Sequence, residues 1–221
     1  MKKAEREKYL QEKLIDMKAC EKQLHLAGFT YIAGTDEVGR GPLAGPVVAA
    51  AVVLPEDFSV LGVDDSKKLS EKKREELYDQ ILDKALAYGF GQRDNNVIDE
   101  INILEATKLS MLDAIAEADK MLLDNTGEII GHVLIDALKL DALEKPQTAI
   151  IKGDSKCVSI AAASIIAKVR RDRMMRDYSQ EYPGYDFEKN KGYGTRSHYE
   201  GISRLGITPI HRKTFLKNLN L

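Results

Sequence analysis

The stretch that most constrains this chain is residues 31–54, in which two adjacent carboxylates stand between an extended run and a glycine-rich corner. The extended run ends at Asp36 and Glu37, three glycines follow between residues 39 and 45, and a valine-rich run completes the stretch. Because glycine costs backbone entropy on folding, repeated glycines indicate unusual dihedral angles or a backbone that closely approaches a ligand. Adjacent carboxylates repel each other unless a cation or water separates them. We therefore interpret the stretch as a metal site joined to a backbone surface that contacts a ligand.

The composition is that of a soluble globular protein with room for one large domain. The chain has 221 residues, of which 43% are hydrophobic and 31% are charged. No apolar run approaches the roughly 20 residues that span a bilayer, and residues 1–7 lack the apolar segment of a secretory signal. We therefore expect a cytoplasmic protein without a membrane segment.

Cysteine and histidine offer little to a mechanism. The spacing of Cys20 and Cys157 predicts neither a disulfide framework nor a zinc site. The four histidines are scattered along the chain and are not spaced as metal ligands. Such a chain suits chemistry that carboxylates support.

The charge distribution is uneven although the net charge is only −2. Residues 152–221 contain 14 basic and 7 acidic side chains, whereas residues 1–151 contain 19 basic and 28 acidic ones. This asymmetry is compatible with a surface that faces a polyanion. Ordinary solvated charges explain it equally well, so the asymmetry alone decides nothing.

Hydrophobic periodicity predicts one α/β domain with helical additions at both termini. We place the first addition at residues 1–27 and the main domain, with a C-terminal helical region, at residues 28–221. We expect Asn95 or Asn96 to cap the long third helix, Leu104 and Leu109 to point inward, and Gly127 to follow its end. The predicted helices cover residues 2–27, 71–86, 97–123, 159–176 and 197–205, and the predicted strands cover 31–36, 46–54, 87–93, 132–136 and 148–154.

Three predicted strands end in acids, namely Asp36 with Glu37, Asp136 and Asp154. Ligand sites of α/β sheets lie outside strand ends. If the strands are neighbours, the four carboxylates converge, and a hard divalent cation such as Mg²⁺ relieves their repulsion. Two such ions about 3.5–4 Å apart can support phosphodiester hydrolysis. Taken alone, Asp136 or Asp154 is better interpreted as a turn former or cap, and the adjacent pair shifts the balance toward metal chemistry.

A dinucleotide-binding site is the main competing interpretation of the glycines. Gly39-x-Gly41-x-x-Ala44 matches the dinucleotide fingerprint, and Asp64 lies about 20 residues further on. That fingerprint requires the glycines to open a helix, whereas Pro46 and the valine-rich run indicate a strand. We therefore disfavour a dinucleotide oxidoreductase.

Further sequence blocks follow residues 31–54 in order along the chain. They are Asp65-Ser66-Lys67-Lys68-Leu69, Leu134-Ile135-Asp136-Ala137, Lys152-Gly153-Asp154, residues 162–172, Lys191-Gly192-Tyr193-Gly194-Thr195 and Pro209-Ile210-His211-Arg212. Together with the first stretch, they resemble the signature blocks of ribonuclease HII, the bacterial type 2 ribonuclease H, from about residue 28 to 215.

The resemblance implies a ribonuclease H-like fold, with a mixed five-stranded sheet flanked by helices. It implies an endonuclease that cuts RNA hybridised to DNA and cuts on the 5′ side of a single ribonucleotide embedded in a DNA duplex. The products would carry 3′-hydroxyl and 5′-phosphate ends. Mg²⁺ or Mn²⁺, as two ions in the catalytic state, would be the cofactor, and ribonucleotide removal from DNA would be the role.

The resemblance also implies roles for particular residues. The four acids Asp36, Glu37, Asp136 and Asp154 correspond to the family's metal ligands, and we expect Asp36 to bridge both ions. Gly39-Arg40-Gly41 resembles the loop that reads the ribose 2′-hydroxyl, the group that distinguishes RNA from DNA. Tyr193 matches the tyrosine that stacks on the deoxyribose after the junction.

Basic side chains near these blocks are candidates for phosphate contacts, which give affinity without sequence preference. Asp172 sits among arginines, so we expect an ion pair there and no metal role. The alternatives that remain are a resolvase-like nuclease on the same fold and a non-catalytic hybrid-binding module. We expect a monomer. The phosphate-contact candidates are Lys67, Lys68, Lys168, Arg170, Arg171 and Arg173.

Overall fold

A computed structural model describes residues 3–217, which fold around one mixed sheet. The strand order is β3-β2-β1-β4-β5; β1 is antiparallel to β2, β2 is antiparallel to β3, and β4 is parallel to both β1 and β5. The predicted α/β class and five-stranded mixed sheet are confirmed. The strands are β1 (Ile32–Val38), β2 (Val47–Val53), β3 (Ala87–Arg93), β4 (His132–Asp136) and β5 (Gln147–Ile150).

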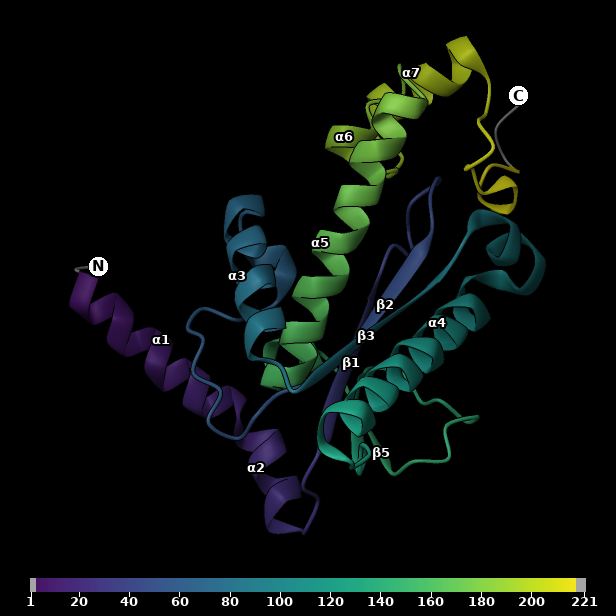
Figure 1. Cartoon of the computed structure of the whole chain (residues 1–221). Coiled ribbons are helices and arrows are strands. Elements are labelled where there is room, and N and C mark those ends of the chain that lie inside the picture. The colour runs from purple at the N-terminus through teal and green to yellow at the C-terminus, as the bar shows by residue number, and fades with distance from the viewer. Residues whose placement is uncertain (1–2, 218–221) are drawn as a thin grey trace.

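Helices cover both faces of the sheet, and further helices precede the first strand and follow the last one (Figure 1). The long helix α4 lies on one face, and α5 with α3 lies on the other. The α-helices are α1 (Lys3–Met17), α2 (Ala19–Leu26), α3 (Glu71–Lys84), α4 (Asn95–Thr126), α5 (Val158–Glu181), α6 (Phe187–Asn190) and α7 (Arg196–Leu205). Short 3-10 helices are η1 (Ser66–Lys68), η2 (Gly153–Ser155) and η3 (Lys213–Phe215).

Strand β2 shows how the two faces share the core. Its side chains alternate, so that Ala50 and Val52 pack in the cluster with α3 and α5, whereas Ala49, Ala51 and Val53 pack in the cluster with α4. All seven residues of β2 are buried, as a strand covered on both faces requires. The strand also replaces the helix that a dinucleotide fingerprint needs after Gly41, so the structure excludes that interpretation.

Glycines let the helices approach the sheet closely. A Cβ on Gly34 of β1 would lie 2.2 Å from the carbonyl carbon of Ser159 in α5, and a Cβ on Gly91 of β3 would lie 2.0 Å from the carbonyl oxygen of Ser110 in α4. The small residues at the start of α5 allow the same approach from the helix side. Helix α5 is thereby pressed against the strand that carries Asp36.

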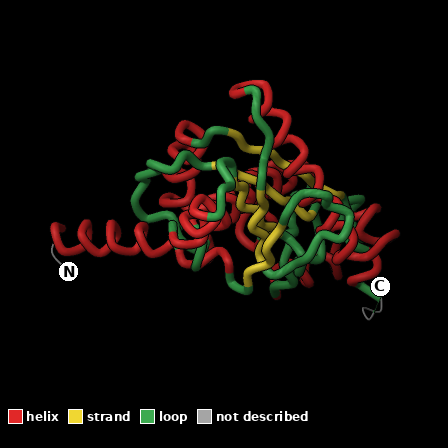
Figure 2. The backbone as a smooth tube through the Cα atoms, turned by 90° about the horizontal axis from the view of Figure 1, so that it is seen from below, coloured by secondary structure: helices red, strands yellow, loops and turns green. Residues whose placement is uncertain are grey.

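The N-terminal region forms two helices instead of the single predicted one, with a break at Lys18. Helix α1 projects from the body of the protein (Figure 2). Near the end of α1, Lys13 forms an ion pair with Asp64. Asp64 directly precedes the block Asp65-Ser66-Lys67-Lys68-Leu69. The proposed boundary between residues 27 and 28 stays a prediction.

The two cysteines correct a sequence expectation, because Cys20 of α2 and Cys157 at the start of α5 form a disulfide. They are 137 residues apart in sequence, and their Cα atoms lie 5.6 Å apart, a normal separation for a disulfide. Spacing along the chain could not predict the bond, since the fold alone brings α2 against α5.

Helix α4 differs from its prediction at its start and on its inner face. Asp94 is the N-cap, because its side chain accepts a hydrogen bond from the Val97 amide; the predicted caps at 95 and 96 are wrong. A kink at Asn102 changes the phase of the helix. Leu104 and Leu109 are exposed, and small residues face the glycines of β3 in their place. Gly127, with φ of 77°, follows the helix end as predicted.

Two further differences concern the C-terminal half. β5 ends at Ile150 and is a partly exposed edge strand, so the predicted extension of this strand to Asp154 is wrong; Asp154 lies in η2. Helix α6 was not predicted. Helices α6 and α7 pack around the far end of α5, at the top of Figure 1.

Between residues 3 and 217, no helix is long and apolar enough to cross a bilayer.

Candidate active site

The sheet topology brings the predicted acids to one edge. β1 and β4 are parallel, with Thr35 opposite Ile135, so the next residues, Asp36 and Asp136, emerge side by side. β5 is parallel to β4, with Ile150 opposite Asp136, and the chain then turns into η2, which carries Asp154. The order of strands therefore brings Asp36 near Asp136 and Asp154, which lie 100 and 118 residues further along the chain.

Asp36 is the most deeply buried of the four acids, with 5% of its surface exposed. Its carboxylate accepts a 2.8 Å hydrogen bond from the Glu37 amide and a further bond from the Ser164 hydroxyl of α5. Burial raises the pKa of Asp36 well above its usual range, and the negative charges of Glu37 and Asp136 raise it further. A group held in this way binds either a proton or a cation.

Glu37 has one occupied and one free carboxylate oxygen. Oε1 lies 3.5 Å from Arg40 Nη1, whereas Oε2 is buried and has no hydrogen-bond partner among residues 3–217. Burial raises the pKa of Glu37; Arg40 opposes this rise, and the charge of Asp136 adds to it. The free oxygen is one that a metal ion would satisfy.

Asp136 and Asp154 are connected through the backbone of Gly153. The Gly153 amide donates a 2.6 Å hydrogen bond to Asp136 Oδ1. Asp154 is 8% exposed. Burial raises the pKa of Asp154, and the charges of Asp65 and Asp136 raise it further. Asp65, which caps η1, is thus a fifth acid near the site, and sequence reasoning gave it no role.

Lys67 lies within the field of this acidic edge. Partial burial alone would lower its pKa, but the charges of Asp36, Asp154, Asp65 and Asp136 raise it overall. The side chain remains exposed at the end of η1. Lys67 is therefore a cation that is close to the acids and open to solvent.

The four acids fit a hard divalent cation by their chemistry. They offer only oxygen donors, which Mg²⁺ and Mn²⁺ accept, and a bound cation would lower the raised pKa values. In the part of the chain that the structure describes, no three acidic, histidine or cysteine side chains are already arranged as a complete ligand set. Arg40, Ser164 and the Gly153 amide instead each interact with one of the mutually repelling carboxylates, namely those of Glu37, Asp36 and Asp136.

The Gly39-Arg40-Gly41 loop lies directly after β1 and needs its first glycine. Gly39 has φ of +96°, and a Cβ there would lie 2.3 Å from Arg171 Nε and 2.7 Å from the Pro46 carbonyl oxygen. No side chain fits in this space, and an L-residue is strained at this φ. Arg40 and Gly41 are exposed and face away from the core.

Arg171 of α5 supports this loop from the protein interior and is not exposed to solvent. Its guanidinium donates to the carbonyls of Pro46 (2.9 Å), Lys191 (2.9 Å) and Ala44 (3.2 Å). The residue is fully buried, and burial lowers its pKa to about 10. The predicted phosphate contact by Arg171 is therefore wrong, because its donors are committed to the backbone.

Arg212 is the second buried arginine and was not singled out from the sequence. It donates to the carbonyls of Gly39 (2.6 Å), Arg40 (2.9 Å) and Gly45 (2.8 Å). Burial lowers its pKa to about 9, and the charge of Arg171 contributes. Arg212 therefore fixes the loop on both sides of Gly41. No periodicity in the sequence separates a buried arginine from an exposed one.

Tyr193 lies beside the same loop. Its ring atom Cε1 is 3.4 Å from the position that a Cβ on Gly41 would occupy, and 44% of the residue is exposed. The loop segments are also paired directly, because the Leu43 amide donates to the Gly192 carbonyl (2.8 Å). The structure thus brings Tyr193 next to the Gly39-Arg40-Gly41 loop, although Gly41 and Tyr193 are 152 residues apart in the sequence.

A buried histidine pair connects Tyr193 to the C-terminal segment. The Thr208 amide donates to His211 Nδ1 (2.8 Å), the two Nε2 atoms of His211 and His198 lie 3.0 Å apart, and His198 Nδ1 contacts the Tyr193 carbonyl (2.9 Å). The fixed donor at Thr208 and the fixed acceptor at Tyr193 assign the protons to His211 Nε2 and His198 Nδ1. Burial lowers the pKa of both, for His211 to about 4.

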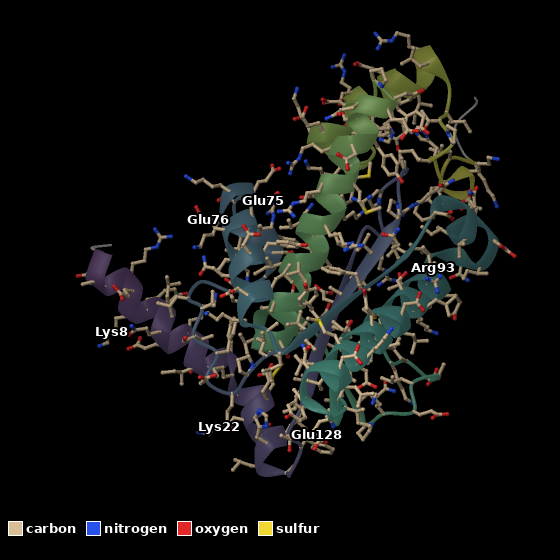
Figure 3. All side chains as sticks on the ribbon, in the orientation of Figure 1. Lys8, Lys22, Glu75, Glu76, Arg93 and Glu128 are labelled. Carbon is tan, nitrogen blue, oxygen red and sulfur yellow. A yellow bond between two sulfur atoms is a disulfide. The ribbon has the colours of Figure 1, made fainter. Side chains whose placement is uncertain are left out.

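The remaining basic candidates lie along α5, except Lys68, which lies in η1. Lys168 Nζ is 2.6 Å from Asp172 Oδ1, which confirms the predicted ion pair of Asp172 and engages Lys168. Arg170 lies over the Phe90 ring at 4.3 Å. Arg173 pairs with Glu75 of α3, which Figure 3 shows on the side of α3 that faces α5. Lys68 lies 3.5 Å from Asp64. Of the six candidates, Lys67 is therefore the one that interacts electrostatically with all four acids.

Comparison with known proteins identifies the family. The family model described as ribonuclease HII matches residues 33–218. A ribonuclease HII of Leuconostoc mesenteroides subsp. mesenteroides is 57% identical over 195 residues, which are 88% of this chain and 74% of the relative. One of Listeria innocua serovar 6a is 55% identical over 214 residues, which are 97% of this chain and 78% of the relative.

The fold agrees with a solved member of the wider group. The crystal structure of the ribonuclease H2 from Pyrococcus horikoshii OT3 has a TM-score of 0.63 and 29% sequence identity, and the match covers 83% of this chain and 93% of that one. The fold is therefore the ribonuclease H-like fold that the sequence implies. Because these matches cover most of its length, the chain belongs to the ribonuclease HII family and is an endoribonuclease with ribonuclease H activity.

Proposed function

We propose that this enzyme hydrolyses the RNA strand of RNA–DNA hybrids and also cuts duplex DNA on the 5′ side of a single embedded ribonucleotide. The products would be a 3′-hydroxyl and a 5′-phosphate. One observation carries the proposal: the acidic edge formed by Asp36, Glu37, Asp136 and Asp154 adjoins a glycine loop beside an exposed tyrosine. This arrangement combines a site for hydrolysis with a surface that can examine a sugar.

We propose that the four acids would hold two divalent cations, Mg²⁺ or Mn²⁺. When bound, the cations supply Lewis-acid stabilisation of the attacking and leaving oxygens of a phosphodiester. The chain's part is to hold carboxylates ready, with Ser164 and the Gly153 amide orienting Asp36 and Asp136. Binding the cations would offset both the burial and the mutual repulsion that raise the pKa values of Asp36, Glu37 and Asp154.

The loop Gly39-Arg40-Gly41 would recognise the 2′-hydroxyl through its backbone. Arg212 already binds the carbonyls of Gly39 and Arg40, which points to the amide N–H groups of Arg40 and Gly41 as donors to the hydroxyl oxygen. Small residues permit this approach, and a deoxyribose offers no oxygen to accept the bond.

Tyr193 would stack on the sugar that follows the ribonucleotide, because its ring is exposed next to Gly41. Lys67 would contact a phosphate near the acids. Lys168 can do so only by leaving Asp172, so we place it further from the reaction. We also propose that the enzyme works as a monomer in the cytoplasm and removes ribonucleotides from DNA.

The alternatives raised by the sequence receive no support from a particular feature. A resolvase-like nuclease would share the acids but not the Gly39-Arg40-Gly41 loop or Tyr193. A non-catalytic hybrid-binding module would tolerate loss of the acids, and all four are present.

The deciding experiment compares two DNA duplexes that differ in one atom. One contains a single ribonucleotide and the other its 2′-deoxy counterpart, and both are incubated with the enzyme in Mg²⁺ or Mn²⁺. We expect a single cut 5′ to the ribonucleotide and no cut in the all-DNA duplex. Equal cutting of both duplexes would refute 2′-hydroxyl recognition.

A further inference from the structure

The N-terminal helix α2 is attached to the start of α5 by two adjacent residues. Cys20 forms the disulfide with Cys157, the N-cap residue of α5. Glu21 Oε1 accepts hydrogen bonds from the Ser159 amide (3.0 Å) and hydroxyl (2.6 Å). Glu21 thus binds the first turn of α5 from outside that helix, where free amides and the helix dipole favour a carboxylate.

A short chain of backbone hydrogen bonds leads from this attachment to the acids. The Cys157 amide donates to the Gly153 carbonyl (2.8 Å), and the Gly153 amide donates to Asp136 Oδ1 (2.6 Å). Asp154 lies between Gly153 and Cys157, in η2. A displacement of Cys157 therefore acts on both Asp136 and Asp154.

The packing around the attachment is open on the side of α2. A cavity of about 270 Å³ lies between the N-terminal helices and the body of the protein, and Glu21, Lys22 and Ser159 are among its lining residues. Lys22 is labelled on α2 in Figure 3. Cys157 is fully buried, whereas Cys20 is only partly buried. Because Cys20 is the less buried of the two, its sulfur is the one that a small reagent meets first. The cavity does not include the cysteines, but it gives α2 space to shift when the bond opens.

We propose that Cys20 and Cys157 form a reversible thiol–disulfide site through which the N-terminal helices set the position of Asp154 and Asp136. In the oxidised form, the bond holds the start of α5 and the acids in place. In the reduced form, only the hydrogen bonds of Glu21 to Ser159 and the packing of Leu24 against the cluster that contains Ile160 hold α2 to α5. The inference rests on the proposed function, since it concerns the metal affinity of those acids.

The reductant of this disulfide would be a low-molecular-weight thiol. A thiolate attacks Cys20 Sγ, the Cys20–Cys157 bond breaks, and Cys157 leaves as a thiolate that takes up a proton. A second thiol attacks the mixed disulfide and releases the Cys20 thiol. The protein disulfide gains two electrons, and two small thiols become one small disulfide. Disulfides are rare in reducing compartments, and those that form there are redox-responsive.

The first part of the test asks whether the bond forms in the full-length protein. The protein is equilibrated in buffers of oxidised and reduced glutathione, and its thiols are alkylated and counted by intact mass. We expect two thiols in reducing buffer and none in oxidising buffer. Two free thiols under all buffers overturn the proposal.

The second part measures Mn²⁺ binding by the electron paramagnetic resonance signal of free Mn²⁺, without any substrate. We expect the oxidised protein to bind Mn²⁺ about tenfold more tightly than the reduced one, an effect typical of groups that orient metal ligands. Cys20→Ser is the matched variant; it should bind as the reduced protein does and should not respond to reductant. Equal affinity of the oxidised and reduced proteins overturns the proposal.

Asp154→Asn separates this inference from the proposed function. If Asp154→Asn weakens Mn²⁺ binding but the redox state does not, the metal role of Asp154 stands and the coupling fails. If Asp154→Asn binds Mn²⁺ as the parent protein does, the metal role of Asp154 fails, and with it the inference that depends on it.

Discussion

The guanidinium of Arg212 lies 2.6 Å from the carbonyl oxygen of Gly39, 173 residues earlier in the chain. The same group also binds the carbonyls of Arg40 and Gly45. The loop that we propose to read the ribose is therefore held by a buried cation from the far end of the protein. Its shape depends on side chains that never contact the substrate.

Replacing Arg212 should misplace this loop. Arg212→Lys keeps the charge but loses the fork of donors that binds several carbonyls at once. Because displacement of a positioning group by about 1 Å can cost on the order of 10²-fold in rate, we expect a loss of that order in kcat/KM on the single-ribonucleotide duplex. Steady-state kinetics measures it. Arg204→Lys, on the exposed surface of α7, is the control and should match the parent enzyme. Unchanged kcat/KM in folded Arg212→Lys would contradict the role.

Gly39 should tolerate no side chain. Gly39→Ala meets both an unfavourable φ of +96° and a contact of 2.3 Å with Arg171. Gly127→Ala is the matched control, since Gly127 has φ of +77° but nothing within 4 Å of the added Cβ. The positive φ alone costs about 1–2 kcal/mol, so Gly39→Ala should lose more unfolding free energy than Gly127→Ala in urea titrations. Equal losses would show that the loop can move away from Arg171.

Tyr193 should act through its ring. Stacking of an aromatic ring on a base is worth about 1–3 kcal/mol. We take the lower part of that range for a ring on a sugar, so Tyr193→Ala should lower kcat/KM at RNA–DNA junctions by about tenfold. Tyr193→Phe retains the ring and should stay close to the parent enzyme. Circular dichroism checks that both variants fold. Junction kinetics of Tyr193→Ala equal to those of the parent would falsify the stacking role.

The buried histidine pair should make stability depend on pH. Burial lowers the pKa of His198 and His211, for His211 to about 4, whereas an unfolded histidine titrates near 6.5. Between about pH 6.5 and 4 the unfolded chain binds more protons, so this pair removes stability as the pH falls through that window. The buried acids with raised pKa values have the opposite effect, since they add to the free energy of unfolding as the pH falls. That effect is the same in the parent protein and in variants of His211, so comparing the two isolates the histidine.

Urea unfolding at pH 7 and pH 5 measures the effect. His211→Asn lacks the titrating group, so it should lose less unfolding free energy between the two pH values than the parent protein. His25→Asn, in the N-terminal helix, is the control and should follow the parent. The same loss in the parent and in His211→Asn would show that His211 is already protonated in the folded state at pH 5.

The sequence predicted the parts of the fold that depend on local pattern. The strands at 87–93 and 132–136 have the predicted bounds, because alternation and short apolar runs specify them directly. The meeting of Asp36 and Asp136 also followed from reasoning about strand ends, since parallel neighbours deliver their last residues to one edge.

The remaining features depend on contacts between distant segments. The Cys20–Cys157 bond, the burial of Arg171 and Arg212, and the pairing of His198 with His211 arise only when loops and helix ends meet. Arg171 illustrates the difficulty: in a basic run it resembles a phosphate contact, yet the carbonyls of three other residues take its donors.

The most direct test of the account concerns Asp136, which binds the Gly153 amide at the centre of the acidic edge. Cleavage of an RNA–DNA hybrid by Asp136→Asn should be compared with hybrid binding by the same variant, with the exposed Asp141→Asn as control. The account predicts a loss of kcat of about 10³-fold, in the range of a lost electrostatic group, while hybrid affinity and Asp141→Asn turnover stay near the parent values. Turnover by Asp136→Asn close to that of the parent enzyme would contradict the claim that these carboxylates carry the hydrolysis.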